Sequence, residues 1–191
     1  PDVAKVLSAT YDGTPLAGKA ERPIRIDRQL ESHVIQLRKE MPKELQGLIW
    51  QSYGVLAESV MVPLYSPLES YPLPYRIGSD SYSDDSAYWQ FRSLTALANT
   101  NPDKYLPLLR GVWSKESAKL YKEVAVLDKT LKQTYTNDKA TALGLAADYS
   151  YGQLEQTYQM AKELRYKLMT DLTKSTEKKY SEEEFKKIMS L

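Results

Sequence analysis

Two residue types that carry much of protein chemistry are absent or nearly so. The 191-residue chain has no cysteine and a single histidine, His33. Without cysteine, a disulfide framework, a thiolate metal site and a cysteine nucleophile are all excluded within these residues. A zinc site would need carboxylates for most of its ligands, which is uncommon. We therefore expect no metal, no cofactor and no catalytic residue of the thiol type in this chain.

An excess of charge of one sign is also lacking, as are long apolar runs. The 26 Lys and Arg residues balance 25 Asp and Glu residues, so the formal net charge is +1. Such a chain has no long-range field to attract nucleic acid or an anionic membrane. No apolar run approaches the roughly 18 residues needed to cross a bilayer, and no signal-peptide pattern opens the chain. We expect a cytoplasmic location, with a secreted or cell-surface location left open.

The residues that are present divide the chain into two compositional halves. The first, to about residue 80, contains most of the ten prolines and three short runs typical of strands, at 33–38, 48–53 and 60–65. Their close spacing favours an antiparallel meander, because parallel neighbours need crossovers of a dozen or more residues. Pro63 has no backbone donor, so the third strand should lie at a sheet edge or end there.

Helical spacing dominates the second half, after an irregular segment at 66–85. Helices are predicted at about 86–99, 103–135 and 139–173, and a short one follows Ser181. Apolar side chains recur on one face of each of the two long helices. This pattern predicts that they pair as an antiparallel hairpin.

Residues 22–38 form the chemically densest segment, with four arginines, two acids and the only histidine. An arginine fork matches the geometry of a carboxylate. We therefore identify Arg28, Glu31 and His33 as candidate substrate-binding residues: Arg28 would bind a terminal carboxylate, and Glu31 or His33 would orient it. A salt-bridged edge strand with a solvated histidine is the structural alternative, and the residues alone leave it open.

A second dense segment spans residues 84–92. Tyr88 and Trp89 cannot both share a buried helix face with Phe91, so one of them should pack against the long irregular segment. The functional alternative is the wall of a substrate pocket.

Several of these segments, taken in order, resemble a known family. They are residues 22–24, 31–38, 49–50, 62–65 and 86–92. Together they are similar to the C-terminal region of the bacterial dipeptidase A type of cysteine dipeptidase. These enzymes are N-terminal-nucleophile hydrolases, related to penicillin V acylase and bile salt hydrolase.

The resemblance implies an α+β fold, namely the antiparallel sheet portion of a four-layer αββα sandwich followed by a helical C-terminal region. Residues 1–110 would be the C-terminal part of the hydrolase domain, and 111–191 a helical extension packed on it. The family's nucleophile is an N-terminal cysteine whose own amine acts as base, and dipeptides are hydrolysed without metal. This chain would then be a fragment, inactive alone, whose partners are a dipeptide substrate, the missing N-terminal portion and further copies of itself.

Two other functions remain open at this point. The amphipathic pair near 112–173 would suit a non-catalytic helical interaction module that binds a partner helix. An independent serine hydrolase would need an ordered serine, histidine and acid around His33.

Overall fold

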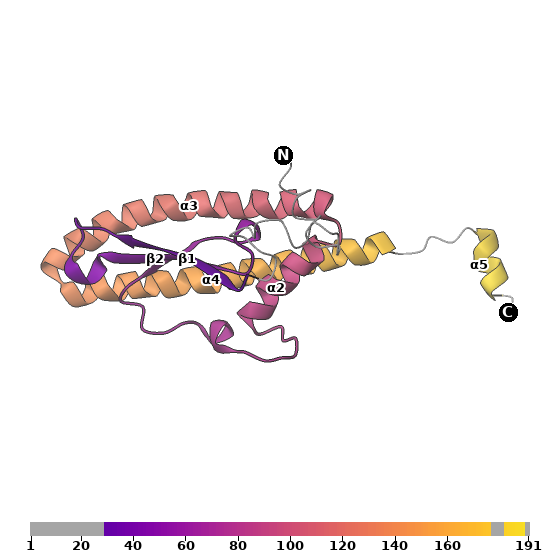
Figure 1. The fold of residues 1–191 in the computed structure, drawn as a ribbon, viewed down its shortest axis with the longest axis horizontal. Coiled ribbons are helices and arrows are strands. Elements are labelled where there is room, and N and C mark those ends of the chain that lie inside the picture. The colour runs from indigo at the N-terminus through magenta and orange to yellow at the C-terminus, as the bar shows by residue number, and fades with distance from the viewer. Residues whose placement is uncertain (1–28, 177–181, 190–191) are drawn as a thin grey trace, which may run out of the picture.

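The structure is a computed structural model that describes residues 29–176 and 182–189. A three-stranded sheet precedes a short helix and a long helical hairpin (Figure 1). The elements are β1 (Glu31–Leu37), β2 (Gly47–Tyr53), β3 (Val62–Tyr65), α2 (Ala87–Ala98), α3 (Pro102–Asn137), α4 (Lys139–Thr176) and α5 (Glu182–Met189), with short 3-10 helices η1 (Lys43–Leu45), η2 (Leu56–Glu58) and η3 (Leu73–Arg76).

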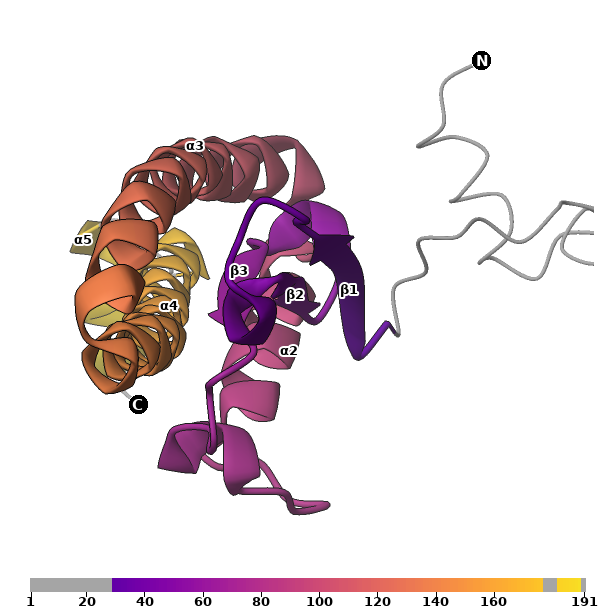
Figure 2. The same ribbon diagram turned by 90° about the vertical axis from the view of Figure 1, so that its left-hand side faces the viewer.

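The predicted α+β content and the antiparallel meander are confirmed. The strand order is β1-β2-β3, and both pairs are antiparallel. Strand β3 is two residues shorter than expected at its start, and it lies at an edge, as Pro63 requires. That edge is covered by α4, whose Ser150 hydroxyl accepts a hydrogen bond from the Tyr65 amide at 2.9 Å. Figure 2 shows β1 at the opposite side of the sheet, away from α4.

The two faces of the sheet have different surroundings. One face packs against α3, where the Trp50 ring centroid lies 4.6 Å from that of Tyr121. The other face carries Ile35, which is 60% exposed, and Ile49, its partner across the β1–β2 pair. Within the described residues α3 thus covers one face of the sheet at Trp50, whereas the other face is open and apolar around Ile35.

The two long helices form the antiparallel hairpin that the apolar spacing predicted. Buried apolar side chains on the two helices include Leu120, Val124, Leu131, Leu154, Tyr158, Ala161, Leu164 and Leu168. Asp138 lies between the helices, and its carboxylate accepts a hydrogen bond from the Thr141 amide at 3.0 Å, which caps α4. The apolar stripes are thus buried against the chain itself. Helix α3 is continuous across residue 110, where the sequence analysis placed the division between the hydrolase part and the helical extension.

A buried ionic cluster ties the end of β1 to the hairpin. Arg38 is 5% exposed, and its Nη1 donates to both carboxylate oxygens of Asp128 at 2.7 Å. The Tyr65 hydroxyl donates to the same carboxylate at 2.8 Å. A buried charge needs such partners, because an unpaired one costs several kcal/mol. The cluster fixes the sheet under α3.

No helix among the described residues is both long and apolar enough to cross a bilayer.

Candidate functional site

A small cavity lies where β1 begins, β2 ends and α2 passes beneath them. Its volume is about 100 Å³, and its wall includes Leu30, Tyr53, Tyr75, Phe91 and Arg92. These residues come from four separate parts of the chain, so the cavity exists only in the folded protein. We take this cavity as the candidate site and call it the β2-end pocket.

Four of the ten residues that line the pocket are aromatic. The Tyr53 ring centroid lies 4.7 Å from that of Tyr75 and 5.8 Å from that of Phe91. Next to Tyr53, Gly54 has a φ of 74°, a conformation that favours glycine. A Cβ at Gly54 would also lie 3.4 Å from the Phe91 Cβ. Glycine thus lets β2 end close against α2.

The polar side chains that line the pocket are those of Gln29, three tyrosines and Arg92. The Tyr53 hydroxyl is buried and has no hydrogen-bond partner of good geometry among the described residues. Burial raises the pKa of Tyr53 far above its ordinary value, and it does the same for Tyr75. Both hydroxyls are therefore neutral at physiological pH. The Tyr75 hydroxyl already donates to the Leu154 carbonyl. Arg92 is half-buried and supplies a permanent positive charge to the pocket wall.

The predicted binding residues are only partly placed by the structure. Arg28 lies outside the described residues, although its neighbour Gln29 lines the pocket. Glu31 and His33 are on one face of β1, where the His33 Nδ1 lies 3.2 Å from a Glu31 carboxylate oxygen. Their side chains are 43% and 49% exposed. Glu31 is the cross-strand partner of Tyr53, but neither Glu31 nor His33 is among the residues that line the pocket.

Sequence reasoning about residues 84–92 was correct about packing and missed one residue. The Trp89 indole donates to the Ser79 carbonyl at 3.2 Å, so Trp89 is the aromatic residue that packs against the irregular segment. Tyr88 is 43% exposed and lines the pocket together with Arg92. Arg92 was not singled out as a binding residue. Its signal was present, because helical spacing places it one turn from Tyr88.

The pocket suits binding better than bond breaking. Pockets that enclose a whole small molecule measure about 300 Å³ or more, so this cavity of about 100 Å³ fits one side chain or terminal group. Among residues 29–176 and 182–189, no serine hydroxyl hydrogen-bonds to His33, and no three acidic, His or Cys side chains gather as metal ligands. Aromatic walls beside a guanidinium fit an apolar group that carries a carboxylate.

A larger hollow of about 800 Å³ lies at the opposite end of β2. It is bounded by residues 66–70 and the first three turns of α4, and its charged lining side chains are acidic: Glu44, Glu69 and Asp148. It is wide open, and it contains none of the predicted site residues. We therefore do not take it as the candidate site.

An antiparallel sheet with one face packed against a helix and a pocket at its end, followed by a long helical hairpin, makes this an α+β protein. The model of peptidase family C69 matches residues 1–115, more than half of the chain. The chain therefore belongs to peptidase family C69.

Curated relatives agree with this assignment. The chain is 26% identical over 164 residues to a probable dipeptidase A of Streptococcus pyogenes serotype M3 (strain SSI-1), a match that covers 81% of this chain and 35% of that protein. It is 28% identical over 141 residues to a probable dipeptidase B of Lactococcus lactis subsp. lactis (strain IL1403), which covers 69% and 30%. A dipeptidase A of Lactobacillus helveticus is 28% identical over 120 residues, covering 63% and 25%. The chain thus spans about a third or less of the length of these relatives.

Proposed function

We propose that this chain forms part of a metal-independent cysteine dipeptidase and contributes one wall of its substrate site. Membership of a peptidase family and relatives named as dipeptidases support the reaction class. The chain has no cysteine, so the nucleophile lies outside it. What these residues supply is scaffold and substrate binding.

The observation that carries the proposal is the asymmetry of the sheet. Helices α3 and α4 cover one face and one edge, whereas the open side carries Ile35 and Leu37, which are 60% and 78% exposed. Apolar side chains on a sheet face are stable only when another layer covers them. An αββα sandwich provides that layer, because its second sheet packs on the inner face of the first. In this arrangement residues 111–191 pack as a helical extension on the hydrolase layers.

The site is built from the β2-end pocket and the adjoining start of β1. Arg28 binds the terminal carboxylate of the dipeptide, and Arg92 adds a second guanidinium from the pocket wall. The Tyr53 ring adds an apolar wall beside this group. Glu31 and His33, which pair with each other on the adjoining strand β1, orient the substrate backbone.

The direct test replaces each arginine in the complete peptidase. Arg28→Ala and Arg92→Ala should each lower kcat/KM for dipeptides by about tenfold or more, because a charge-assisted bond to the carboxylate is lost. The matched control is Arg110→Ala, which removes an exposed arginine of α3. Wild-type kcat/KM in both Arg28→Ala and Arg92→Ala would refute the proposed carboxylate site. A dipeptide amide, which has no terminal carboxylate, should show little difference between these variants and wild type.

A further inference from the structure

The wall of the β2-end pocket is irregular on one side. Tyr75 and Ile77 line the pocket there, and a loop without regular structure connects them to the lining residues in the first turns of α2. Loops of this kind open readily unless other elements hold them. The Ser86 hydroxyl donates to the Ile77 carbonyl at 2.8 Å, which joins the two sides of the loop. This bond does not by itself fix the segment against the rest of the protein.

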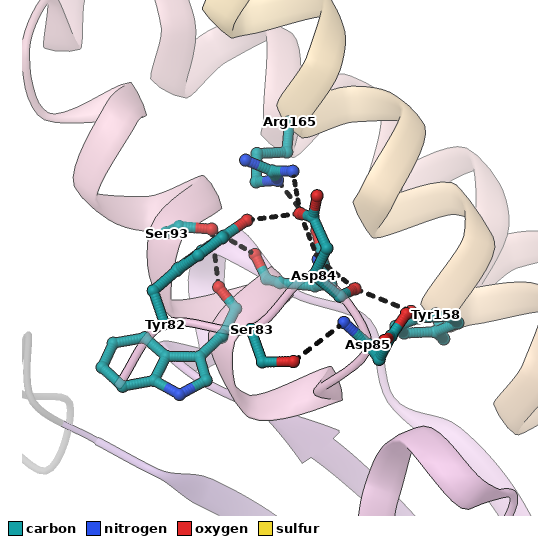
Figure 3. Close-up of polar contacts among 9 residues, drawn as sticks. Tyr82, Ser83, Asp84, Asp85, Ser93, Tyr158 and Arg165 are labelled. Carbon is teal, nitrogen blue, oxygen red and sulfur yellow. Dashed lines mark hydrogen bonds and ion pairs between the residues drawn. The ribbon is translucent and has the colours of Figure 1, made fainter. Parts of the chain in front are cut away.

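One face of α4 provides the fixed points. The Leu154 carbonyl accepts a hydrogen bond from the Tyr75 hydroxyl at 2.9 Å, and the Tyr158 hydroxyl donates to the Asp84 carbonyl at 2.9 Å. Two turns further along α4, Arg165 pairs with the Asp84 carboxylate. Positions four and eleven residues from Leu154 lie on the same side of a helix. Figure 3 shows Arg165 and Tyr158 reaching from α4 to the loop around Asp84.

Arg165 makes the most demanding of these contacts. Its side chain is 9% exposed, and its Nε donates to the Gln90 amide oxygen at 2.9 Å while Nη2 pairs with Asp84. Gln90 is fully buried, and its amide nitrogen donates back to the Asp84 carbonyl at 2.7 Å. Loop, α2 and α4 are thus joined in a closed set of bonds. A guanidinium suits this task, because it can donate in two directions from one rigid plane.

The electrostatics of Asp84 agree with this arrangement. Hydrogen bonds from the Tyr82 hydroxyl and from Gln90, together with the charge of Arg165, hold the pKa of Asp84 below its ordinary value. The carboxylate is therefore ionised wherever the protein is folded near neutral pH.

We propose that Arg165 is a positioning residue for substrate binding: by holding Asp84 and Gln90, it sets the place of Tyr88 and Arg92 in the pocket wall. Helix α4 lies beyond the residues that the family model matches, and none of its residues lines the pocket. In this proposal it supports the site without touching the substrate. The proposal rests on the proposed function of the pocket.

The test uses Arg165→Gln and Arg165→Lys in the complete peptidase, with Asp171→Asn as control. Asp171 is also on α4, and its pair with Lys104 is about half exposed. In Arg165→Gln we expect KM for dipeptides to rise about tenfold while kcat stays within about twofold, the pattern of lost substrate binding. Arg165→Lys keeps the charge but cannot bond Asp84 and Gln90 together, so its KM should lie between. Asp171→Asn should keep wild-type values. An unchanged KM in Arg165→Gln would overturn the proposal.

A second measurement separates this proposal from the proposed function. Amide hydrogen exchange should become faster in residues 79–92 of Arg165→Gln and stay unchanged in β2. If the wild-type peptidase hydrolyses no dipeptide, the proposed function fails, and unchanged exchange in residues 79–92 would then overturn the positioning role separately. Should Arg165→Gln fail to fold, Asp84→Asn takes its place, because the Asp84 side chain is 48% exposed. Its KM should also rise, and a wild-type KM there would equally overturn the proposal.

Discussion

At the scale of single residues, the clearest coupling is between Glu44 and the start of α4. The Glu44 carboxylate accepts hydrogen bonds from the Lys139 ammonium and the Tyr135 hydroxyl, each at 2.6 Å. The first of these contributes most to lowering the pKa of Glu44 from 4.5 to about 2. This contact joins the η1 segment to the α3–α4 connection. Such residue-level bonds hold the sheet in place beneath the hairpin.

The lowered pKa of Glu44 makes the free energy of unfolding depend on pH, with a definite sign. Glu44 binds a proton less tightly in the folded state than in the unfolded chain. The stabilisation that the ionised Glu44 carboxylate gives the folded state is therefore complete above pH 4.5 and is lost as the pH falls toward about 2. We expect the difference in free energy of unfolding between wild type and Glu44→Gln to shrink over that range. Urea unfolding at a series of pH values measures it. Glu40→Gln, which changes an exposed glutamate, is the control and should show a smaller pH-dependent difference.

At the scale of elements, β1 is the part of the sheet with the least cover. Its side chains Val34, Ile35 and Leu37 are 55%, 60% and 78% exposed. In the described residues β1 pairs only with β2, so its outer edge presents free backbone donors and acceptors. An apolar strand with an open edge promotes association with further strands.

We therefore predict that the 191-residue chain self-associates through β1. The double substitution Ile35→Lys and Leu37→Lys should reduce this association, because charges on an edge strand oppose edge-to-edge pairing. The control is Val126→Lys on α3, which alters an apolar residue that is 65% exposed but lies on the helical hairpin. Sedimentation velocity would distinguish the species. A monodisperse wild-type monomer would contradict the prediction.

At the scale of the whole molecule, the chain covers about a third or less of its relatives and contains no cysteine. In the proposed enzyme the attacking thiol and its base come from residues beyond this chain. The β2-end pocket then supplies recognition, and α4 supplies rigidity to its wall. Chemistry and binding would thus be contributed by different layers of one sandwich.

The corresponding prediction is that the 191-residue chain alone hydrolyses no dipeptide, whereas the complete peptidase does. Iodoacetamide should abolish the activity of the complete peptidase because it alkylates the thiol nucleophile. EDTA should leave that activity unchanged if no metal takes part. The release of free alanine from an alanine dipeptide measures the activity in each of these experiments. Turnover by the chain alone would refute the assignment of the nucleophile.

The sequence by itself determined the elements and the family. Periodicity located the long helices because a 3.6-residue apolar repeat is a local property, and Pro63 predicted the edge position of β3. The ordered segments from residue 22 to residue 92 carried the family resemblance that the family model supports. The start of β3 and the 3-10 turn at Leu73–Arg76 were missed, because short irregular turns depend on what packs around them.

Only the tertiary structure decided where the pocket lies and what holds it. Arg165 and Asp84 are 81 residues apart in the chain, and no local pattern links them. Arg38 and Asp128 are likewise 90 residues apart. Spacing rules describe neighbours along one helix or strand, whereas contacts between elements depend on how those elements pack. The pocket and its supporting bonds therefore emerge only when β2, α2 and α4 come together.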